Sequence, residues 1–469
     1  MDAASFTPAG CRAPRWLPLL ALLVTVPAHA LSYRMPPDAA LVDGAPTVVL
    51  GHIESAAADP QRPNSATLYQ LDVDRLLKGL AAAAILRVRV PGAYDATQPG
   101  SLVVPGAPVF MPGERLLLML QPRGDGSYAI SQLALGAFHV RSIDGIDVLL
   151  RQPDQAAPQQ WRRLDAFGSW ISSRAGGLLA AADYWVQLTG NVPALKYALE
   201  GSPPVRWFDF DQGRSVTFYS SEQGQIGLLD GGVAEFRRAI AAWNADTGSN
   251  INYVYGGLSS ASGGMDHADG VNEILFNDPN GELSGVFDCT NGGVIAYGGY
   301  WTSGNKSTHR DGTFQMISEA DIVVQNGAGC ILSALSNSNA DEVFAHELGH
   351  TLGLAHPCGE SGVPACTPGS AVDDAIMRPY VHADSRGASL RSDDQQAIAY
   401  DYSSGSSPPP PAAVGRGDPE AGIPNSSDSS SSGGGGALDA TLLLALALAL
   451  WRRAIRRFWW SPQRYFACY

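Results

Sequence analysis

Three histidines and one glutamate in the last third of the sequence have the types and spacing of a metal site. His346 and His350 are four residues apart, so on a helix both imidazoles project from one face. Two such nitrogens can hold Zn²⁺ at about 2.0–2.1 Å, but a catalytic zinc needs a third protein ligand and an open position. His356 can supply that ligand, because Gly353 can adopt a positive φ, end the helix and turn the chain back. Glu347 would then act as general base for a zinc-bound water.

A structural histidine cluster is the alternative interpretation of this segment. A bare His-Glu-x-x-His occurs by chance in many helices, but the added glycine and histidine make a chance match roughly five-hundred-fold rarer. A structural cluster would not need Gly353, and a closed structural zinc site would not leave Glu347 beside an open position. The pattern therefore favours one catalytic zinc ion.

Helices and strands are predicted around this motif. Asn339 is expected to cap the helix that carries it, with Glu342 in the capping-box position. An earlier helix, capped by Asp230, would bury one apolar face. The residues of that face are Val233, Phe236, Ile240 and Trp243. Strands are predicted at Arg206–Trp207, Ser215–Tyr219, Ile251–Tyr255 and Glu319–Gln325.

The zinc motif and a later segment together resemble the metzincin metallopeptidases. Ala375-Ile376-Met377-Arg378-Pro379 resembles their Met-turn, in which a methionine, here Met377, packs beneath the zinc site. Matrixins are the most similar subgroup, because a strand like Glu319–Gln325 precedes their zinc helix and a segment like Ser392–Ile398 opens their final helix. The resemblance covers about 205–403 and implies an α+β catalytic domain with a twisted sheet, an active-site helix and a C-terminal helix.

The resemblance also implies an activity, a zinc-dependent endopeptidase acting on proteins or peptides. His346, His350 and His356 would bind the zinc ion, and Glu347 would be the catalytic residue. An extended substrate is expected along the edge of the strand Glu319–Gln325. The alternative is a surface-tethered binding or adhesion protein with a catalytically silent metzincin fold, against which the intact Glu347 argues.

The N-terminal half is predicted to consist mainly of short β-strands. Residues 31–155 read as short strands between Gly/Pro turns, and predict a small all-β domain, a barrel or sandwich of possibly OB-like fold. The predicted strands include Thr47–Leu50, Leu68–Val73, Ile85–Val90 and Arg115–Leu120. Its role is open, with inhibition or anchoring of substrate as one hypothesis. Residues 156–204 are predicted as a helical connector.

Both ends of the chain indicate export. Residues 1–30 carry Arg12 and Arg15, a short apolar run and Ala28-His29-Ala30, the pattern of a signal peptide with its cleavage site. Residues 404–436 are rich in Pro, Ser and Gly and predict a stalk. Residues 437–469 hold an apolar stretch of only ~22 Å, short of a ~30 Å hydrocarbon core, followed by arginines.

Glycines, a short apolar helix and an arginine cluster resemble the bacterial GlyGly-CTERM sorting signal. That resemblance implies cleavage near Gly433–Gly436 and transfer to the cell surface or release. The alternative is a plain, thin membrane anchor, so membrane contact is expected through this tail before or without processing. The protein is expected to be secreted or attached to the cell surface.

The net charge and the cysteines indicate which partners and which disulfides to expect. The formal net charge of −14 argues against nucleic acid as a partner, and a monomer is expected. Four cysteines lie between the two terminal segments, an even number that predicts disulfides in an exported chain. Three connectivities are possible. The favoured one joins the near neighbours Cys358 and Cys366, and leaves Cys289 with Cys330.

Further cation sites are candidates only. Four aspartates among glycines and asparagines suit Ca²⁺, but they suit ordinary turns equally well. They are Asp269, Asp278, Asp288 and Asp311. His267 and His309, with Asp269 and Asp311, lie in the region of the matrixin structural zinc without its spacing, and are interpreted as loop residues.

Overall fold

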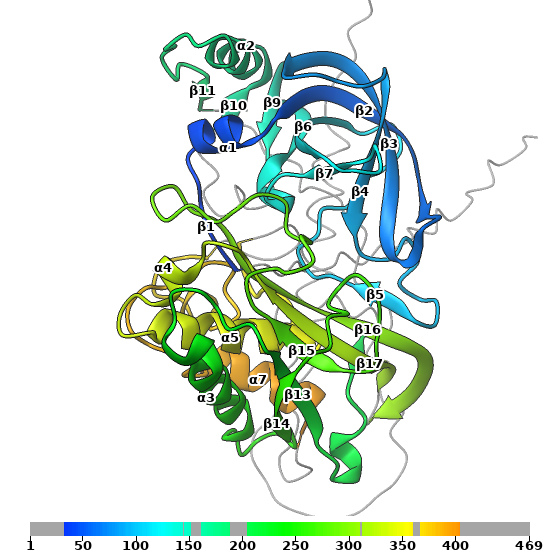
Figure 1. Cartoon of the computed structure of the whole chain (residues 1–469), viewed down its shortest axis with the longest axis vertical. Coiled ribbons are helices and arrows are strands. Elements are labelled where there is room, and N and C mark those ends of the chain that lie inside the picture. The colour runs from blue at the N-terminus through cyan, green and yellow to red at the C-terminus, as the bar shows by residue number, and fades with distance from the viewer. Residues whose placement is uncertain are drawn as a thin grey trace, which may run out of the picture. The chain divides into compact units, whose positions relative to one another are not determined.

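The computed structural model describes residues 32–143, 145–151, 161–187, 204–309, 312–359 and 366–403. The described chain forms two β-sheets with seven helices, an α+β fold (Figure 1). The predicted signal peptide, stalk and C-terminal tail lie outside the described residues. Among the helices of the described ranges, none has the length and apolar character needed to cross a membrane.

A closed barrel lies at the centre of the first sheet. Its strands are β2 (Thr47–Asp59), β3 (Arg62–Lys78), β4 (Ile85–Pro91), β6 (Arg115–Pro122) and β7 (Tyr128–Ile130). β2, β3, β4 and β7 pair in that order, and β6 pairs with both β2 and β7, so the five strands close on themselves. The predicted small β domain is thus a barrel rather than a sandwich.

The same sheet continues beyond the barrel. β8 (Ala137–Ile143), β9 (Ile146–Leu150), β10 (Trp161–Arg163) and β11 (Trp185–Val186) follow one another from β6 outward. Helices α1 (Asp38–Gly44) and α2 (Leu164–Ala175) lie near this extension (Figure 1). The segment predicted as a connector therefore contains a helix, but its described part also adds two strands to the N-terminal sheet.

The second sheet carries the predicted zinc helix. Its main strands, in spatial order, are β14 (Tyr253–Ser259), β13 (Val216–Ser221), β15 (Asn272–Leu275), β17 (Gly312–Val324) and β16 (Gly293–His309). The first four are parallel and β16 is antiparallel to β17. The short β12 (Val205–Arg206) pairs with β17.

Helices pack against this sheet and against each other. α3 (Val233–Asn244) contacts α5 (Ser338–Thr351) and β14, and α5 contacts β16 and β17. Three further helices complete the region: α4 (Gly329–Leu332), α6 (Ala371–Asp374) and α7 (Ser392–Asp401). The predicted strand before the zinc helix and the predicted final helix are both present.

Two predicted helix caps are wrong. α3 is capped by Gly232, and Asp230 stands outside the helix with a φ of 51°. α5 is capped by Asn337 in the left-handed region, so Asn339 is already inside the helix, where its side-chain amide donates to the Ile331 carbonyl. Capping residues and first-turn residues have similar compositions, which is why the sequence misplaced these starts by a few positions.

Two strands from the N-terminal half pair with the second sheet. β1 (Ser32–Arg34) and β5 (Ser101–Val103) both lie along β16. Because β17 has β16 on one side and β15 on the other, it has no free edge. The prediction of a substrate along the edge of Glu319–Gln325 is therefore wrong, because that strand is interior to the sheet.

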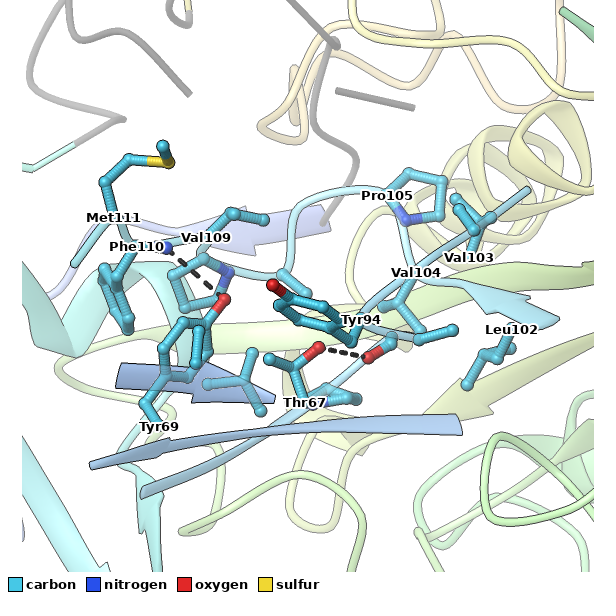
Figure 2. Close-up of a pocket in the computed structure, with 18 of the residues that line it drawn as sticks. Thr67, Tyr69, Tyr94, Leu102, Val103, Val104, Pro105, Val109, Phe110 and Met111 are labelled. Atoms are coloured by element: carbon cyan, nitrogen blue, oxygen red, sulfur yellow. Dashed lines mark hydrogen bonds between the residues drawn. The ribbon is translucent and has the colours of Figure 1, made fainter. Parts of the chain in front are cut away.

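The connection that carries β5 folds back over the barrel (Figure 2). The Thr67 hydroxyl donates to the Gly92 carbonyl at 2.9 Å, and the Phe110 amide donates to the Tyr69 hydroxyl at 3.4 Å. Between connection and barrel remains a cavity of about 330 Å³, lined mainly by apolar side chains. These bonds hold the connection at both ends, and so position β5 against the second sheet.

A group of buried carboxyls lies between β15 and β17. The side chains of Glu273 and Asp321 are fully buried. Burial raises the pKa of Glu273 to about 7 and that of Asp321 well above its usual value, and the neighbouring charges of Glu319 and Glu282 raise both pKa values further. Their folded-state pKa values thus lie above the unfolded ones.

This group predicts that the protein loses stability as the pH rises. A carboxyl with a raised folded pKa stabilises the fold below its unfolded pKa, and this contribution is lost as pH passes the folded value. For Glu273 we expect a loss on the order of 3 kcal/mol, spread from about pH 4.5 to slightly above pH 7, of which about 1 kcal/mol falls between pH 6 and pH 8. Thermal unfolding should show a lower midpoint at pH 8 than at pH 6. Glu273→Gln should flatten that difference, and the exposed control Glu222→Gln should not. Equal midpoints at both pH values would contradict this account.

Candidate active site

Helix α5 and the turn after it bring the predicted site residues together. His346, Glu347 and His350 lie on the last turns of α5, which ends at Thr351. Gly353 has a φ of 86°, and a Cβ there would lie 2.6 Å from the side chain of Val205. The position therefore requires glycine, and the resulting turn brings His356 back toward the helix, as predicted.

The three histidines converge at their Nε2 atoms. The Nε2 atom of His346 lies 2.8 Å from that of His350 and 3.1 Å from that of His356. Within the described ranges, no other group of three or more His, Cys, Asp or Glu side chains brings its donor atoms together in this way.

Hydrogen bonds show which ring nitrogens face the centre of the cluster. His346 Nδ1 lies 2.7 Å from the Ile376 carbonyl, and His350 Nδ1 lies 2.8 Å from the Leu354 carbonyl. A carbonyl only accepts, so both Nδ1 atoms carry the hydrogen. Burial lowers the pKa of all three histidines well below the usual value, so the rings are neutral and these Nε2 atoms present lone pairs. Lone pairs facing each other at about 3 Å repel unless a cation lies between them, and neutral imidazoles suit Zn²⁺.

Glu347 lies beside this cluster and is fully buried. Its Oε1 atom accepts a hydrogen bond from the Ser32 amide of β1 at 3.3 Å. Burial raises the pKa of the Glu347 carboxyl to about 8. A carboxylate with a raised proton affinity beside a metal site has the chemistry of a general base.

The segment predicted as a Met-turn lies against the same helix. A Cβ at Gly349 would lie 2.2 Å from the Met377 sulfur, so glycine makes room for this methionine. Met377 is buried, and the carbonyl of its neighbour Ile376 is the acceptor for His346. The segment therefore both packs under α5 and orients one of its histidines.

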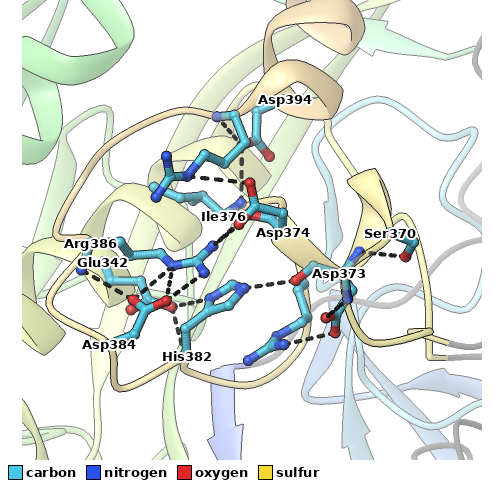
Figure 3. A network of polar contacts seen from close by, with 12 residues as sticks. Glu342, Ser370, Asp373, Asp374, Ile376, His382, Asp384, Arg386 and Asp394 are labelled. Carbon is cyan, nitrogen blue, oxygen red and sulfur yellow. Dashed lines mark hydrogen bonds and ion pairs between the residues drawn. The ribbon is translucent and has the colours of Figure 1, made fainter.

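Asp394 holds this segment from the start of α7, a role that sequence reasoning missed (Figure 3). Its carboxylate accepts from the Ile376 amide at 2.9 Å and from the Met377 amide at 3.1 Å. Asp394 thus positions His346 through the backbone of Ile376. The only sequence signal was its place in the predicted final helix.

A second connection joins α5 to the chain beyond the Met-turn (Figure 3). The amide and Nδ1 of His382 lie 2.8 and 2.6 Å from Glu342 Oε1, and its Nε2 atom lies 2.8 Å from the Asp373 carbonyl. Glu342 was predicted as part of a capping box. Its carboxylate instead fixes the segment around His382, which follows the Met-turn, to helix α5.

Both predicted disulfides are present. Cys289 pairs with Cys330, and Cys358 pairs with Cys366. The second bridge follows His356 and precedes the Met-turn, so it fixes the chain between these two parts of the site.

The other candidate cation ligands do not converge in the described structure. Asp269, Asp278 and Asp288 each accept backbone amides of their own loops, which is the turn role. His309 lies 3.5 Å from Asp211, and Asp311 lies outside the described residues. Calcium and a structural zinc thus remain predictions.

A comparison with protein families agrees with this geometry. Residues 276–389 match the family described as metallo-peptidase family M12 (Reprolysin_5). The matched range includes α5, all three histidines and Met377. This match supports a metzincin-type zinc metallopeptidase, implies zinc as its metal, and suggests proteins or peptides as substrates. The comparison with curated proteins finds no match.

The Asp394 contacts predict that its loss weakens metal binding. Asp394→Ala removes both bonds to the Met-turn, and loosening an outer partner of a metal ligand typically costs 10–100-fold in metal affinity. We expect a loss of about ten-fold in zinc affinity, measured by competition with a chromogenic chelator. The neighbouring Asp393→Ala, which removes a carboxylate of the same helix turn, should leave affinity unchanged. Equal affinities in both variants would show that the Met-turn does not position His346.

Proposed function

We propose that the protein is an exported zinc-dependent endopeptidase. The observation that carries the proposal is the convergence of three neutral imidazole nitrogens beside the buried Glu347. A structural histidine cluster would have no use for an acidic side chain at that place. The family match supports the peptidase chemistry, and the strand β16, whose Gly298 lies against Glu347, supports an endopeptidase that binds extended peptides.

The residues around the site have distinct roles in this proposal. His346, His350 and His356 would hold the zinc ion, and the carbonyls of Ile376 and Leu354 keep two of the rings in the required tautomer. When bound, zinc supplies a Lewis acid that polarises a peptide carbonyl and makes water a better nucleophile.

Glu347 would move the proton in the reaction. Its carboxylate would take a proton from the attacking water and deliver it to the nitrogen of the leaving amine. The raised pKa of Glu347 makes its carboxylate a stronger base toward the water and lets the protonated carboxyl keep the proton until the leaving amine takes it.

We further propose a matrixin-like arrangement over 205–403 and a location outside the cytoplasm. The disulfides and the signal-like residues 1–30 support export. The GlyGly-CTERM-like residues 437–469 would hold the chain at a membrane until processing. We propose that the protein works as a monomer.

The peptidase proposal predicts that Glu347→Gln separates metal binding from catalysis. Zinc should remain near one ion per chain by mass spectrometry, because the three histidines are untouched. Cleavage of a quenched peptide library should fall at least 100-fold, the usual contribution of a general base. Because Ser32 covers Glu347, the assay is run in the wild-type background and with Ser32→Pro.

His356→Ala is the matched variant on the metal side, and should lose zinc and cleavage together. Zinc binding without cleavage in either background would contradict the peptidase and leave the surface-tethered binding protein as the better account.

A further inference from the structure

The proposed active site is closed in this structure. Glu347 and His350 are 0% exposed, and His346 and His356 are 2% and 1% exposed. A peptidase must admit an extended peptide to these groups, so something in the chain occupies the place of a substrate. The elements concerned are β1 and β5, both of which come from the N-terminal half.

β1 lies between two backbones beside Glu347. On one side it pairs antiparallel with β16, with Ser32 opposite Ala296 and Tyr33 opposite Val294. On the other side the Tyr33 amide donates to the Pro379 carbonyl at 3.2 Å, and Tyr33 forms a parallel bridge with Tyr380. An extended segment hydrogen-bonded on both edges is the way a peptide is bound by strand addition.

β5 occupies the other half of the same edge. It pairs antiparallel with β16, with Ser101 opposite Thr302 and Val103 opposite Tyr300. Between the two strands remain Tyr297–Gly299, and Gly298 is the residue that faces Glu347, since a Cβ there would lie 2.7 Å from the Glu347 carbonyl. The edge of β16 is therefore covered on both sides of the proposed base.

The direction of the two strands matches the two halves of a cut peptide. Both run antiparallel to β16, so β5 approaches the Gly298 position with its C-terminal end. β1 begins there, with the Ser32 amide on Glu347, and runs away from it. Together they follow the path of one extended chain along β16, on the two sides of Gly298.

The N-terminal half anchors both strands firmly. β1 leads into α1 (Figure 1). The Asp38 carboxylate of α1 accepts from the Arg162 guanidinium at 2.7 and 2.9 Å and from the Tyr184 hydroxyl at 2.9 Å. β5 is held through the Thr67 and Tyr69 bonds (Figure 2). Three-residue strands bind weakly by themselves, but a tethered segment has an effective concentration in the millimolar range.

We infer that the N-terminal barrel keeps the peptidase latent by laying β1 and β5 into the two halves of its substrate groove. The inference rests on the proposed function and specifies its regulation. An extended peptide would have to displace these strands, and it would then lie antiparallel to β16 with Pro379–Tyr380 on its other side. Release of the barrel would activate the enzyme.

The test uses one proline in each strand of the zinc-loaded chain. Ser32→Pro removes the amide that contacts Glu347, and Val103→Pro removes an amide from β5. The control is Ser142→Pro, an exposed serine of β8 that pairs with Asp147 far from β16. Three quantities are measured: amide exchange of 293–302, affinity for a fluorescent peptide hydroxamate, and turnover of a quenched peptide.

Loosening either strand should expose the groove. We expect faster exchange in 293–302, and a gain on the order of ten-fold in hydroxamate affinity and in turnover, because a larger fraction of molecules is competent to bind. The control should match the wild type. Ser32→Pro, which changes a three-residue strand outside the barrel, keeps the test decisive if Val103→Pro fails to fold.

Two results would overturn the inference. If exchange accelerates while affinity and turnover stay at wild-type values, the strands do not compete with substrate. If exchange in 293–302 is unchanged in Ser32→Pro, β1 does not protect the edge. A gain in hydroxamate affinity without turnover in any variant would support the occupied groove and contradict the proposed peptidase instead.

Discussion

Mutual repulsion of nitrogen lone pairs is the constraint on which the rest of the site depends. The Nε2 atoms of His346, His350 and His356 face one another at about 3 Å, and the rings are neutral because they are buried. The carbonyls of Ile376 and Leu354 hold two of them in place. A cation bound between these nitrogens would remove the repulsion. The helix, the glycine turn and the Met-turn are the parts that hold the nitrogens in position against this repulsion.

The N-terminal half and the catalytic sheet are joined along the edge of β16. β16 pairs with β17 on one side and with β1 and β5 on the other, so the edge where a peptide would bind is also where the N-terminal half attaches. Tyr33 belongs to the core of the barrel, and Val103 to the core of the catalytic sheet. The two cores therefore interlock at the groove. A single surface serves both for holding the barrel and, in our account, for binding substrate.

The sequence predicted what depends on local spacing. His346 and His350 share a helix face because of the 3.6-residue period, and Gly353 ends that helix because few other residues tolerate its φ. The barrel strands and both disulfides also followed from local patterns. Contacts between residues far apart in the sequence were not predicted. No local pattern indicates that the Ser32 amide contacts Glu347, or that the Asp394 carboxylate binds the Ile376 amide. The edge strand was assigned to Glu319–Gln325, because the order of strands in a sheet is set by tertiary pairing.

The most direct test of the central claim is X-ray absorption at the zinc edge on the purified chain. Our account predicts about one zinc per chain, with three imidazole nitrogens at about 2.0–2.1 Å. In His356→Ala the bound zinc, and with it the absorption edge, should be lost. A chain that binds no zinc, or a zinc shell made of sulfur or of oxygen alone, would contradict the assignment of the three histidines and the peptidase chemistry built on it.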